Sequence, residues 1–306
     1  MSSPAETLEG PDFFIVGAPK CGTTAMTDYL GQHPEIGMCP RKETHHFATD
    51  LYDRLAVKRG QRPPDRRRFL DLFADLQDFP RRGEASVWHL YSAAAAAEIK
   101  SFHADAAILV MVRNPVEMLP SLHSQFVYVG LEPVEDFEAA LALDAERERS
   151  GTPVGFPPRS YRAAIRYGEQ LRRYIDVFGR DRIHVIRYED FRENTLATYR
   201  RACEFLGVDP GFEPEIEVIN PNKQVRSRLL GRLVRRPPES LRPILHRVTT
   251  EGMRRRAGNE MNRWNTKFTR RAPAPDAVQL GIRPDVERQV YELDELLGLD
   301  VSSWLD

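Results

Sequence analysis

FFIVGAPKCGTTAM, residues 13–26, is the most informative stretch of this 306-residue chain. It begins with Phe13–Val16, a short apolar run of the kind that forms a buried strand, and Gly17 ends the run. Gly22 comes five positions later, and residues 23–30 have helical character. A glycine-bracketed loop between a strand and a helix directs backbone N–H groups and the positive end of the helix at one point. The stretch therefore predicts an anion-binding loop.

The position of the lysine separates this loop from the loop of nucleoside triphosphatases. Those proteins carry G-x-x-x-x-G-K-[ST], with the lysine directly after the second glycine. Here the glycine spacing is the same, but the lysine is Lys20, inside the loop, and Thr23 and Thr24 follow the second glycine. The pattern indicates an anion site with different chemistry. A tight strand-to-helix turn without a ligand is the alternative.

The order of strand and helix patterns predicts the fold class. Apolar runs at 13–16, 85–88, 108–112 and 183–186 are strand candidates, and helical patterns separate them. Helices are predicted at 23–30, 69–75, 93–97, from 115 onward, and at 133–148, 161–178 and 198–206. This alternation predicts an α/β, P-loop-like fold of three layers, with a central parallel sheet flanked by helices.

Length and composition predict the domain organisation. With 41% hydrophobic and 29% charged residues, the chain has the composition of a globular protein. Residues 1–11 are predicted to be a flexible tail and residues 12–306 a single domain. Residues 223–271 hold 15 Lys/Arg against three Glu and are predicted to be a helical, arginine-rich insertion. This insertion is either a solvated segment or a lid on the acceptor side that faces an anionic ligand.

Charge and cysteine content exclude several classes of protein. The net charge of −1 gives no overall reason to expect nucleic acid or a membrane surface as a partner. The three cysteines are widely spaced, so we expect neither a disulfide framework nor a metal site. The N-terminus has no signal pattern, and no window approaches the roughly 18 apolar residues of a membrane span. These features predict a cytoplasmic protein.

The segment P-K-C-G-T-T resembles the 5′-phosphosulfate loop of the sulfotransferases that use 3′-phosphoadenosine 5′-phosphosulfate (PAPS). The resemblance implies that PAPS is the co-substrate and that no metal is needed. It implies that Lys20 reaches the bridging oxygen and stabilises the negative charge on the leaving phosphate. The implied cofactor-binding residues of the loop are Pro19, Lys20, Cys21, Gly22, Thr23 and Thr24.

A second segment, ILVMVRNPVEMLPSLHSQF at residues 108–126, resembles the 3′-phosphate motif of the same family. In that motif an arginine at a strand end precedes a serine by eight positions, and Arg113 and Ser121 have this spacing. A guanidinium suits phosphate because its donors form a rigid fork. The resemblance implies that both residues bind the 3′-phosphate, which distinguishes PAPS from ATP. For Arg113 alone, a surface ion pair is the alternative.

K-E-T-H, residues 42–45, resembles the K-E-x-H segment of sulfotransferases related to heparan sulfate 3-O-sulfotransferases and their bacterial relatives. The resemblance implies that Glu43 is the general base, and His45 is the second candidate. A base is needed because a hydroxyl is a poor nucleophile until its proton leaves, and burial would raise the proton affinity of a carboxylate. His46 and Ala48 replace an aromatic and an acidic residue of the heparan sulfate enzymes, so a glycosaminoglycan acceptor does not follow.

Three interpretations of the chain remain open at this point. The first is a sulfotransferase that acts on a hydroxyl, or as second choice an amine, of a carbohydrate, glycolipid or natural-product acceptor. The second is a P-loop kinase or nucleoside triphosphatase, which would require magnesium. The third is a non-enzymatic protein that binds an anionic polymer through its arginine-rich segment. Glu43 could also be only a surface partner of Lys42 or Arg41, and the adjacent histidines 45 and 46 lack further spaced metal ligands.

Overall fold

The structure is a computed structural model that describes residues 8–52, 54–58, 60–150, 156–216, 223–225, 266–268 and 276–306. The described residues belong to two compact units. One unit contains those within 8–122, 136–216 and 276–306, and the other contains 123–135 together with 223–225 and 266–268.

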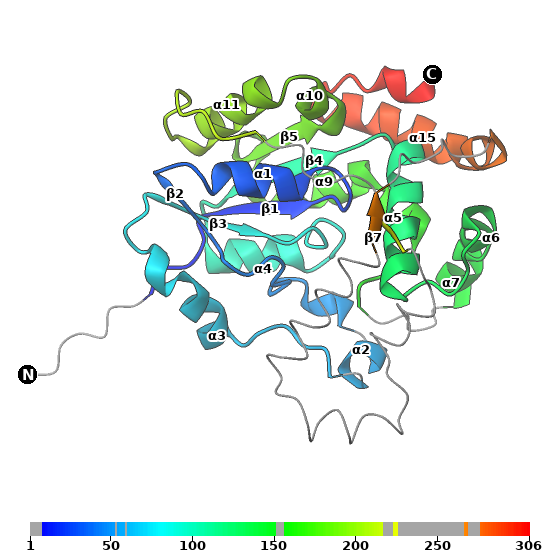
Figure 1. Cartoon of the computed structure of the whole chain (residues 1–306), viewed down its shortest axis with the longest axis horizontal. Helices are drawn as coiled ribbons and strands as arrows, with labels where there is room; N and C mark the ends of the chain where they lie inside the picture. Colours follow the sequence, from blue (N-terminus) through cyan, green and yellow to red (C-terminus); the bar gives the residue numbers. More distant parts are fainter. Residues whose placement is uncertain are drawn as a thin grey trace, which may run out of the picture. The chain divides into compact units, whose positions relative to one another are not determined.

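A five-stranded sheet forms the centre of the first unit, in the order β2-β3-β1-β4-β5 (Figure 1). All neighbouring strands in it are parallel. Its strands are β1 (Phe13–Gly17), β2 (Ile36–Met38), β3 (Arg81–Ala85), β4 (Ala107–Val112) and β5 (Ile183–Arg187). Parallel strands need crossover connections, and helices supply them here, which confirms the predicted α/β fold.

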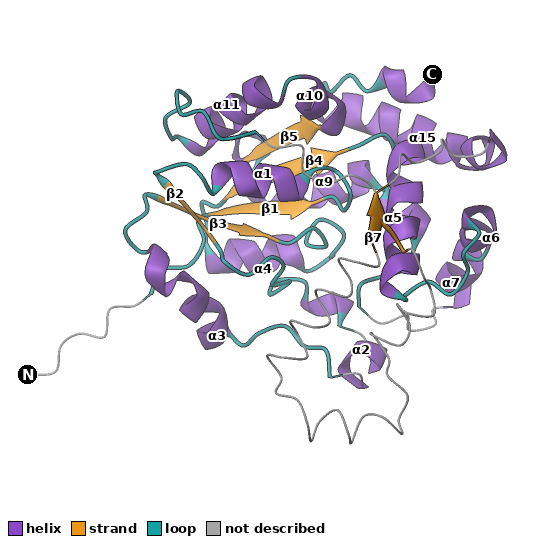
Figure 2. Ribbon diagram, in the orientation of Figure 1, coloured by secondary structure: helices purple, strands orange, loops and turns teal. Residues whose placement is uncertain are grey.

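Helices cover both faces of this sheet (Figure 2). One layer contains α1 (Thr23–Leu30), α10 (Tyr188–Glu193) and α11 (Thr195–Leu206); the other contains α4 (Ala95–Phe102) and α9 (Tyr167–Phe178). The remaining described α-helices are α2 (Arg54–Lys58), α3 (Arg66–Leu70), α5 (Pro115–Val129), α6 (Phe137–Ala142), α7 (Asp144–Ser150), α8 (Tyr161–Ala164) and α15 (Asp276–Leu297).

The core lies on both faces of β1 and β4. Residues 13–16 and 108–112 have no exposed surface, as expected for strands covered by helices on two sides. Such strands are continuous apolar runs, which is why the predictions at 13–16 and 108–112 are confirmed. The strand predicted at 183–186 is also confirmed, as β5, although it is only partly buried and contains His184.

Strand β3 begins four residues before the predicted strand at 85–88. Its first residues are Arg81 and Arg82, and these charges hide the strand pattern. Both side chains are neutralised at the start of β1, where Arg81 pairs with Asp12 at 3.1 Å and Arg82 with Glu9 at 2.5 Å. β2 is only three residues long and was not predicted.

Two predicted long helices are each divided in two, one at Leu143 and the other at Ile165 and Arg166. The predicted helix 133–148 is α6 followed by α7, and α6 begins where the Asp136 side chain accepts from Ala139 N–H. The predicted helix 161–178 is α8 followed by α9, and Ser160 caps α8 in the same way. A side-chain acceptor at the first turn satisfies an otherwise unpaired N–H group.

Parts of the predicted tail and insertion lie outside the described residues. Of the tail at 1–11, residues 1–7 are not described, whereas Glu9 bonds to Gln77 and Gly10 O accepts from Arg82. Of the arginine-rich segment 223–271, only β6 (Lys223–Val225) and β7 (Thr266–Phe268) are described, and they pair antiparallel.

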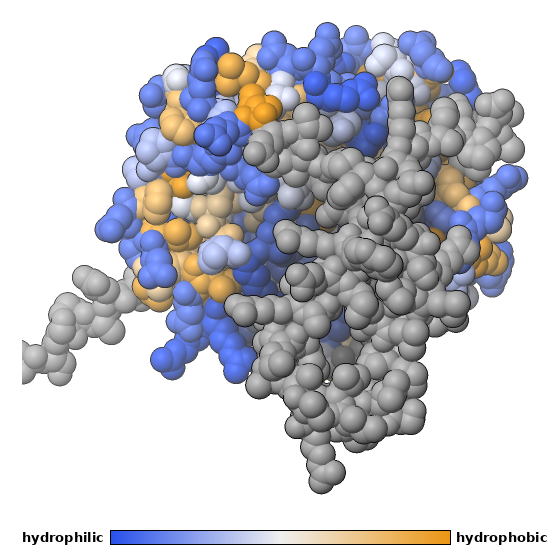
Figure 3. Space-filling view, viewed as in Figure 1, coloured by the Kyte–Doolittle hydropathy of each residue, from blue (hydrophilic) through white to orange (hydrophobic). Residues whose placement is uncertain are grey.

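The described surface carries no single large apolar patch in the view of Figure 3, where hydrophilic and hydrophobic residues are interspersed. The exposed large apolar side chains come from separate parts of the chain and are Val57, Val129, Leu143, Ile216 and Tyr291. None of the described helices combines the length and apolarity that crossing a membrane requires.

Candidate functional site

The glycine-bracketed loop leaves β1 at Gly17 and enters α1 after Gly22. Ala18 N–H donates to the carbonyl of Met111 at 2.6 Å, which fastens the loop to β4. A Cβ atom on Gly17 would lie 2.5 Å from Cβ of Leu90, so no side chain fits there. Gly22 has φ +88°, a conformation that glycine adopts without the steric cost other residues incur. Both glycines are therefore required by the loop itself.

Two of the predicted catalytic residues have unusual backbone conformations. Lys20 has φ +65° and His45 has φ +49°, and they are the only non-glycine residues with positive φ in the described part of the chain. A side chain makes this conformation unfavourable, by about 1–3 kcal/mol, and such residues cluster at functional sites. Both positions are thus candidates for function on geometric grounds.

The predicted ligands of the loop differ in exposure. The Thr24 side chain is exposed at the start of α1, whereas Thr23, Pro19 and Cys21 are buried. Burial raises the pKa of Cys21 to about 12, so its side chain is a neutral thiol. Its Sγ atom donates to the Pro19 carbonyl at 3.4 Å. The Cys21 side chain therefore packs inward, and an anion at the loop would meet its backbone.

Arg113, at the end of β4, lies against the loop. Its guanidinium donates to the carbonyl of Lys20 at 3.3 Å and lies over the ring of Tyr188, 4.4 Å from the centroid. It also pairs with Glu117 at 2.6 Å, so the ion pair considered from the sequence exists together with the loop contact. Ser121 is buried on α5, and no hydrogen bond between described residues joins it to Arg113.

Side chains of other elements form hydrogen bonds to the backbone that directly follows β4. Tyr167 is fully buried, and its hydroxyl donates to the Arg113 carbonyl at 3.2 Å. Glu189 accepts from Asn114 N–H at 2.9 Å. Sequence reasoning gave neither residue this role, because both contacts join segments more than 50 residues apart.

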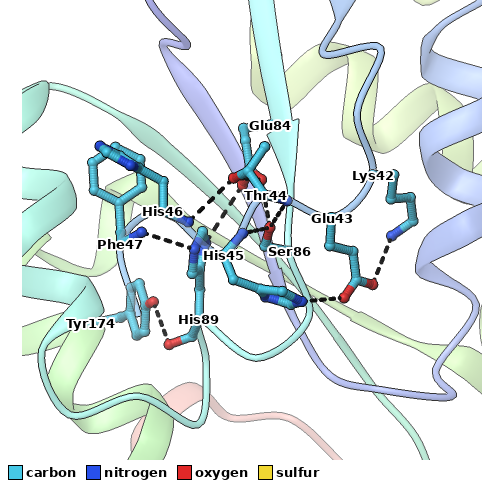
Figure 4. Close-up of polar contacts among 10 residues, drawn as sticks. All are labelled: Lys42, Glu43, Thr44, His45, His46, Phe47, Glu84, Ser86, His89 and Tyr174. Atoms are coloured by element: carbon cyan, nitrogen blue, oxygen red, sulfur yellow. Dashed lines mark hydrogen bonds and ion pairs between the residues drawn. The ribbon is translucent and has the colours of Figure 1, made fainter. Parts of the chain in front are cut away.

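Glu43 and His45 form a close pair (Figure 4). His45 Nε2 lies 2.8 Å from Glu43 Oε2, and Lys42 Nζ lies 3.5 Å from Glu43 Oε1. Burial acts to raise the pKa of Glu43, but the hydrogen bond and charge of His45, with the charge of Lys42, lower it below its ordinary value. The increase in proton affinity expected from burial is therefore reversed, and the carboxylate is ionised at neutral pH.

The contact with Glu43 fixes the roles of the two His45 nitrogens. An ionised carboxylate only accepts hydrogen bonds, so Nε2 is the donor. Nδ1 is buried and has no hydrogen-bond partner among the described residues. The Glu43 side chain, in contrast, is 25% exposed. Of the two candidate bases, Glu43 is the more exposed.

The adjacent histidines have separate surroundings. His46 Nδ1 donates to the Pro64 carbonyl at 2.7 Å, and its ring stacks on Phe69 with centroids 4.2 Å apart. The His46 and His45 rings therefore do not face a common site. Within the described ranges, no group of three or more His, Cys, Asp or Glu is placed to hold a metal ion.

One aromatic ring contacts His45, and a second ring stacks on the first. Phe156 meets the His45 ring edge to face, with centroids 4.7 Å apart, and Tyr52 stacks on Phe156 at 4.7 Å and 9°. Both rings are half-buried. Sequence reasoning missed them, because Tyr52 and Phe156 are over 100 residues apart and neither belongs to a recognisable motif.

A five-stranded parallel sheet flanked by helices, with a glycine-bracketed loop after β1, defines a P-loop-like fold. Residues 10–274 match the sulfotransferase domain family, and the chain belongs to that family.

Relatives and solved structures agree with this membership. Carbohydrate sulfotransferase 15 of Mus musculus and of Homo sapiens are each 26% identical over an aligned stretch of 259 residues, and each match covers 67% of this chain and 45% of the relative. The chain thus spans about half the length of these curated relatives. The crystal structure of a sulfotransferase from Alicyclobacillus acidocaldarius is 28% identical, with a TM-score of 0.69, and the match covers 97% of this chain and 99% of that one.

Proposed function

We propose that this chain transfers a sulfuryl group from PAPS to a hydroxyl of a carbohydrate or another small acceptor. One observation carries the proposal: anion-binding groups and a carboxylate base belong to three neighbouring strand ends. β1 leads to Lys20, β4 ends at Arg113, and Ser86, after β3, bonds the loop of Glu43 and His45. In open α/β sheets, ligands bind at the carboxyl ends of the strands.

The donor set of the loop suits a bound phosphosulfate. Backbone N–H groups, the exposed Thr24 hydroxyl and the cations Lys20 and Arg113 are the groups that bind anions at helix N-termini. When bound, PAPS supplies an activated sulfuryl group on a phosphate leaving group. Lys20 would stabilise the charge that develops on this phosphate, and Arg113, with Ser121, would hold the 3′-phosphate.

Glu43 would remove the proton of the acceptor hydroxyl. In this step the acceptor oxygen bonds to sulfur, the bond from sulfur to the bridging phosphate oxygen breaks, and the hydroxyl proton passes to Glu43. Glu43 has the exposure for this role, whereas the free nitrogen of His45 is buried. His45 would orient the carboxylate and balance its charge.

Two aromatic rings near His45 favour a cyclic acceptor. The C–H faces of a sugar ring pack well against aromatic faces, and the half-buried Phe156 contacts His45 while the half-buried Tyr52 stacks on Phe156. The curated relatives are named carbohydrate sulfotransferases. These two observations support a carbohydrate ahead of an open-chain alcohol or an amine.

Thermal unfolding with three ligands separates the candidate functions. The sulfotransferase proposal expects adenosine 3′,5′-bisphosphate (PAP) to stabilise the protein by about 2.7 kcal/mol at one hundred times its Kd. Stabilisation by ATP with magnesium instead would indicate a kinase, and stabilisation by heparin alone would indicate a polymer-binding protein. Transfer of labelled sulfate from PAPS to a panel of sugars, glycosaminoglycans, glycolipids and phenols then identifies the acceptor, with Glu43→Gln as the inactive control.

A further inference from the structure

A fully buried carboxylate, Glu84, lies beneath the loop that carries Glu43 and His45 (Figure 4). It belongs to β3, one residue before the strand ends. Its Oε1 atom accepts from Ser86 Oγ at 2.5 Å and from Thr44 Oγ1 at 2.7 Å. Burial raises the pKa of Glu84, and these two hydrogen bonds act in the opposite direction.

The two hydroxyls bind three consecutive backbone N–H groups of the loop. Ser86 Oγ accepts from the N–H groups of Thr44 at 3.1 Å and His45 at 2.9 Å. Thr44 Oγ1 accepts from His46 N–H at 3.3 Å. A hydroxyl has one proton, and here Glu84 receives both protons, so the lone pairs of both oxygens are directed at the loop. Glu84 thus determines the orientation of the acceptors that hold this backbone.

His89 extends the same arrangement by one residue. Its Nε2 accepts from Phe47 N–H at 3.4 Å, so its proton is on Nδ1, which lies 3.5 Å from Glu84 Oε2. Tyr174 donates to the His89 carbonyl at 2.9 Å. Burial keeps the pKa of His89 well below its ordinary value, so the ring is neutral. Four successive N–H groups, 44 to 47, are therefore held by side chains from other segments or by Thr44.

The loop needs such support because of His45. Its positive φ is unfavourable, and the surrounding structure must hold such a residue in place. We propose that Glu84 is a positioning residue for the reaction: through Ser86 and Thr44 it keeps His45 at positive φ and so maintains the 2.8 Å contact with Glu43. The inference rests on the proposed function, in which Glu43 is the base.

Two substitutions separate positioning from general stability. Glu84→Met removes the acceptor at nearly constant size, and Glu84→Gln keeps a carbonyl oxygen for the two hydroxyls. For Glu84→Met we expect a full number of PAP sites by calorimetry, an unchanged KM for PAPS and a kcat about 100-fold lower per PAP site, because small misplacements of a reacting group have that effect. Glu84→Gln should restore kcat to within about tenfold of the wild type.

Hydrogen exchange gives a readout that needs no acceptor. In Glu84→Met bound to PAP, amides 44–46 should exchange at least about tenfold faster, while amides of β1 and β4 stay protected. Asp12→Leu is the matched control, because Asp12 is a buried carboxylate that binds Arg82 N–H at the opposite end of β3. It should lower the melting temperature without changing kcat per PAP site or exchange at 44–46.

The outcomes decide between the alternatives. A kcat per PAP site that is unchanged in Glu84→Met overturns the proposal, as does equal loss in Glu84→Met and Glu84→Gln. If Glu84→Met does not fold, Ser86→Ala decides, because it keeps the carboxylate and removes the hydroxyl that binds residues 44 and 45. Normal kcat in that variant also overturns the proposal. Full activity in Glu43→Gln would instead refute the proposed role of Glu43 as the base. The hydrogen-exchange result would then still decide whether Glu84 holds residues 44–46 in place.

Discussion

Lys20 and His45 have positive φ, a backbone conformation that would be less strained with glycine. Glycine adopts positive φ without the steric cost of a Cβ atom, and Gly22 in the same loop does so. The presence of an amine and an imidazole at such positions implies that their side chains contribute something that glycine cannot. In the proposed function, Lys20 contributes a positive charge to the loop that binds the phosphosulfate, and His45 contributes the hydrogen bond to Glu43.

Lys20→Met should separate the charge of this residue from its backbone conformation. Methionine also has a Cβ atom, so the conformational cost stays and the melting temperature should change little. Loss of the charge should lower kcat about 100- to 1000-fold, the range for removing one donor that stabilises a transition-state anion. Lys100→Met on α4 is the control and should keep full turnover. Normal turnover in Lys20→Met would remove Lys20 from the mechanism.

His45→Phe should change the pH dependence of the reaction. In the wild type the pKa of Glu43 lies below its ordinary value, so the ionised base persists as the pH falls and is lost only when the pH passes through that lowered pKa. The phenyl ring keeps the packing on Phe156 but removes the hydrogen bond and charge, so burial then raises the pKa, opposed by Lys42 alone. Activity should therefore fall at a higher pH than in the wild type.

Profiles of kcat/KM against pH test this shift, with circular dichroism recorded at each pH to confirm folding. An acid limb that stays in place, or moves to lower pH, would show that His45 does not set the charge of Glu43.

The candidate site residues were predictable from local sequence only where they belong to a recognisable motif. Lys20, Glu43 and Arg113 belong to short contiguous segments, and the structure brings Arg113 to the loop and His45 to Glu43. Glu84 was not found, because its neighbours in sequence form no pattern and its contact with the loop, through Thr44, joins residues 40 positions apart. A buried carboxylate in a strand is recognisable only when the partners that satisfy it are known.

At the scale of elements, the candidate site lies at the ends of three strands and the start of one helix. β1 and β4 were predictable because both faces are buried and their sequences are uniformly apolar. β2 and β3 were missed or shifted because they are short or charged, and their pairing depends on partners far along the chain. The predicted long helices split at Leu143, between α6 and α7, and at Ile165 and Arg166, between α8 and α9.

Gly22→Ala should show how closely the residue before α1 is packed by its neighbours. A methyl group there would adopt φ +88° and lie 3.1 Å from the Tyr188 ring and 3.2 Å from the Phe191 ring. Gly207→Ala, at the end of α11, has a similar φ of +71° with nothing within 4 Å, so it measures the backbone cost alone, about 1 kcal/mol. Gly22→Ala should be destabilised by about 1 kcal/mol more, because the rings must move.

Urea unfolding of both variants measures this difference. Equal destabilisation of the two variants would mean that the Tyr188 and Phe191 rings move without an energetic cost. The Tyr188 ring would then not be a rigid support for Arg113, which lies over it.

At the scale of the whole molecule, ligand binding and stability are linked. A ligand that binds only the folded state raises the free energy of unfolding by RT ln(1 + [L]/Kd), so pairs of ligands that differ in one phosphate report on the residue that binds that phosphate. PAP and adenosine 5′-phosphate differ only in the 3′-phosphate. Their comparison in wild type and variant forms a thermodynamic cycle for Arg113.

Arg113→Met should reduce the preference for PAP over adenosine 5′-phosphate. A charge-assisted hydrogen bond contributes about 1.5–3 kcal/mol, so wild type should bind PAP at least about tenfold more tightly, and the variant should lose most of this difference, with Ser121 left to bind the 3′-phosphate. The guanidinium pairs with Glu117 in this structure, and this competing contact reduces the gain from the phosphate. Calorimetry of both ligands with both proteins gives the coupling directly. If the variant keeps the full preference, the 3′-phosphate is bound elsewhere and Arg113 serves only to brace the Lys20 carbonyl.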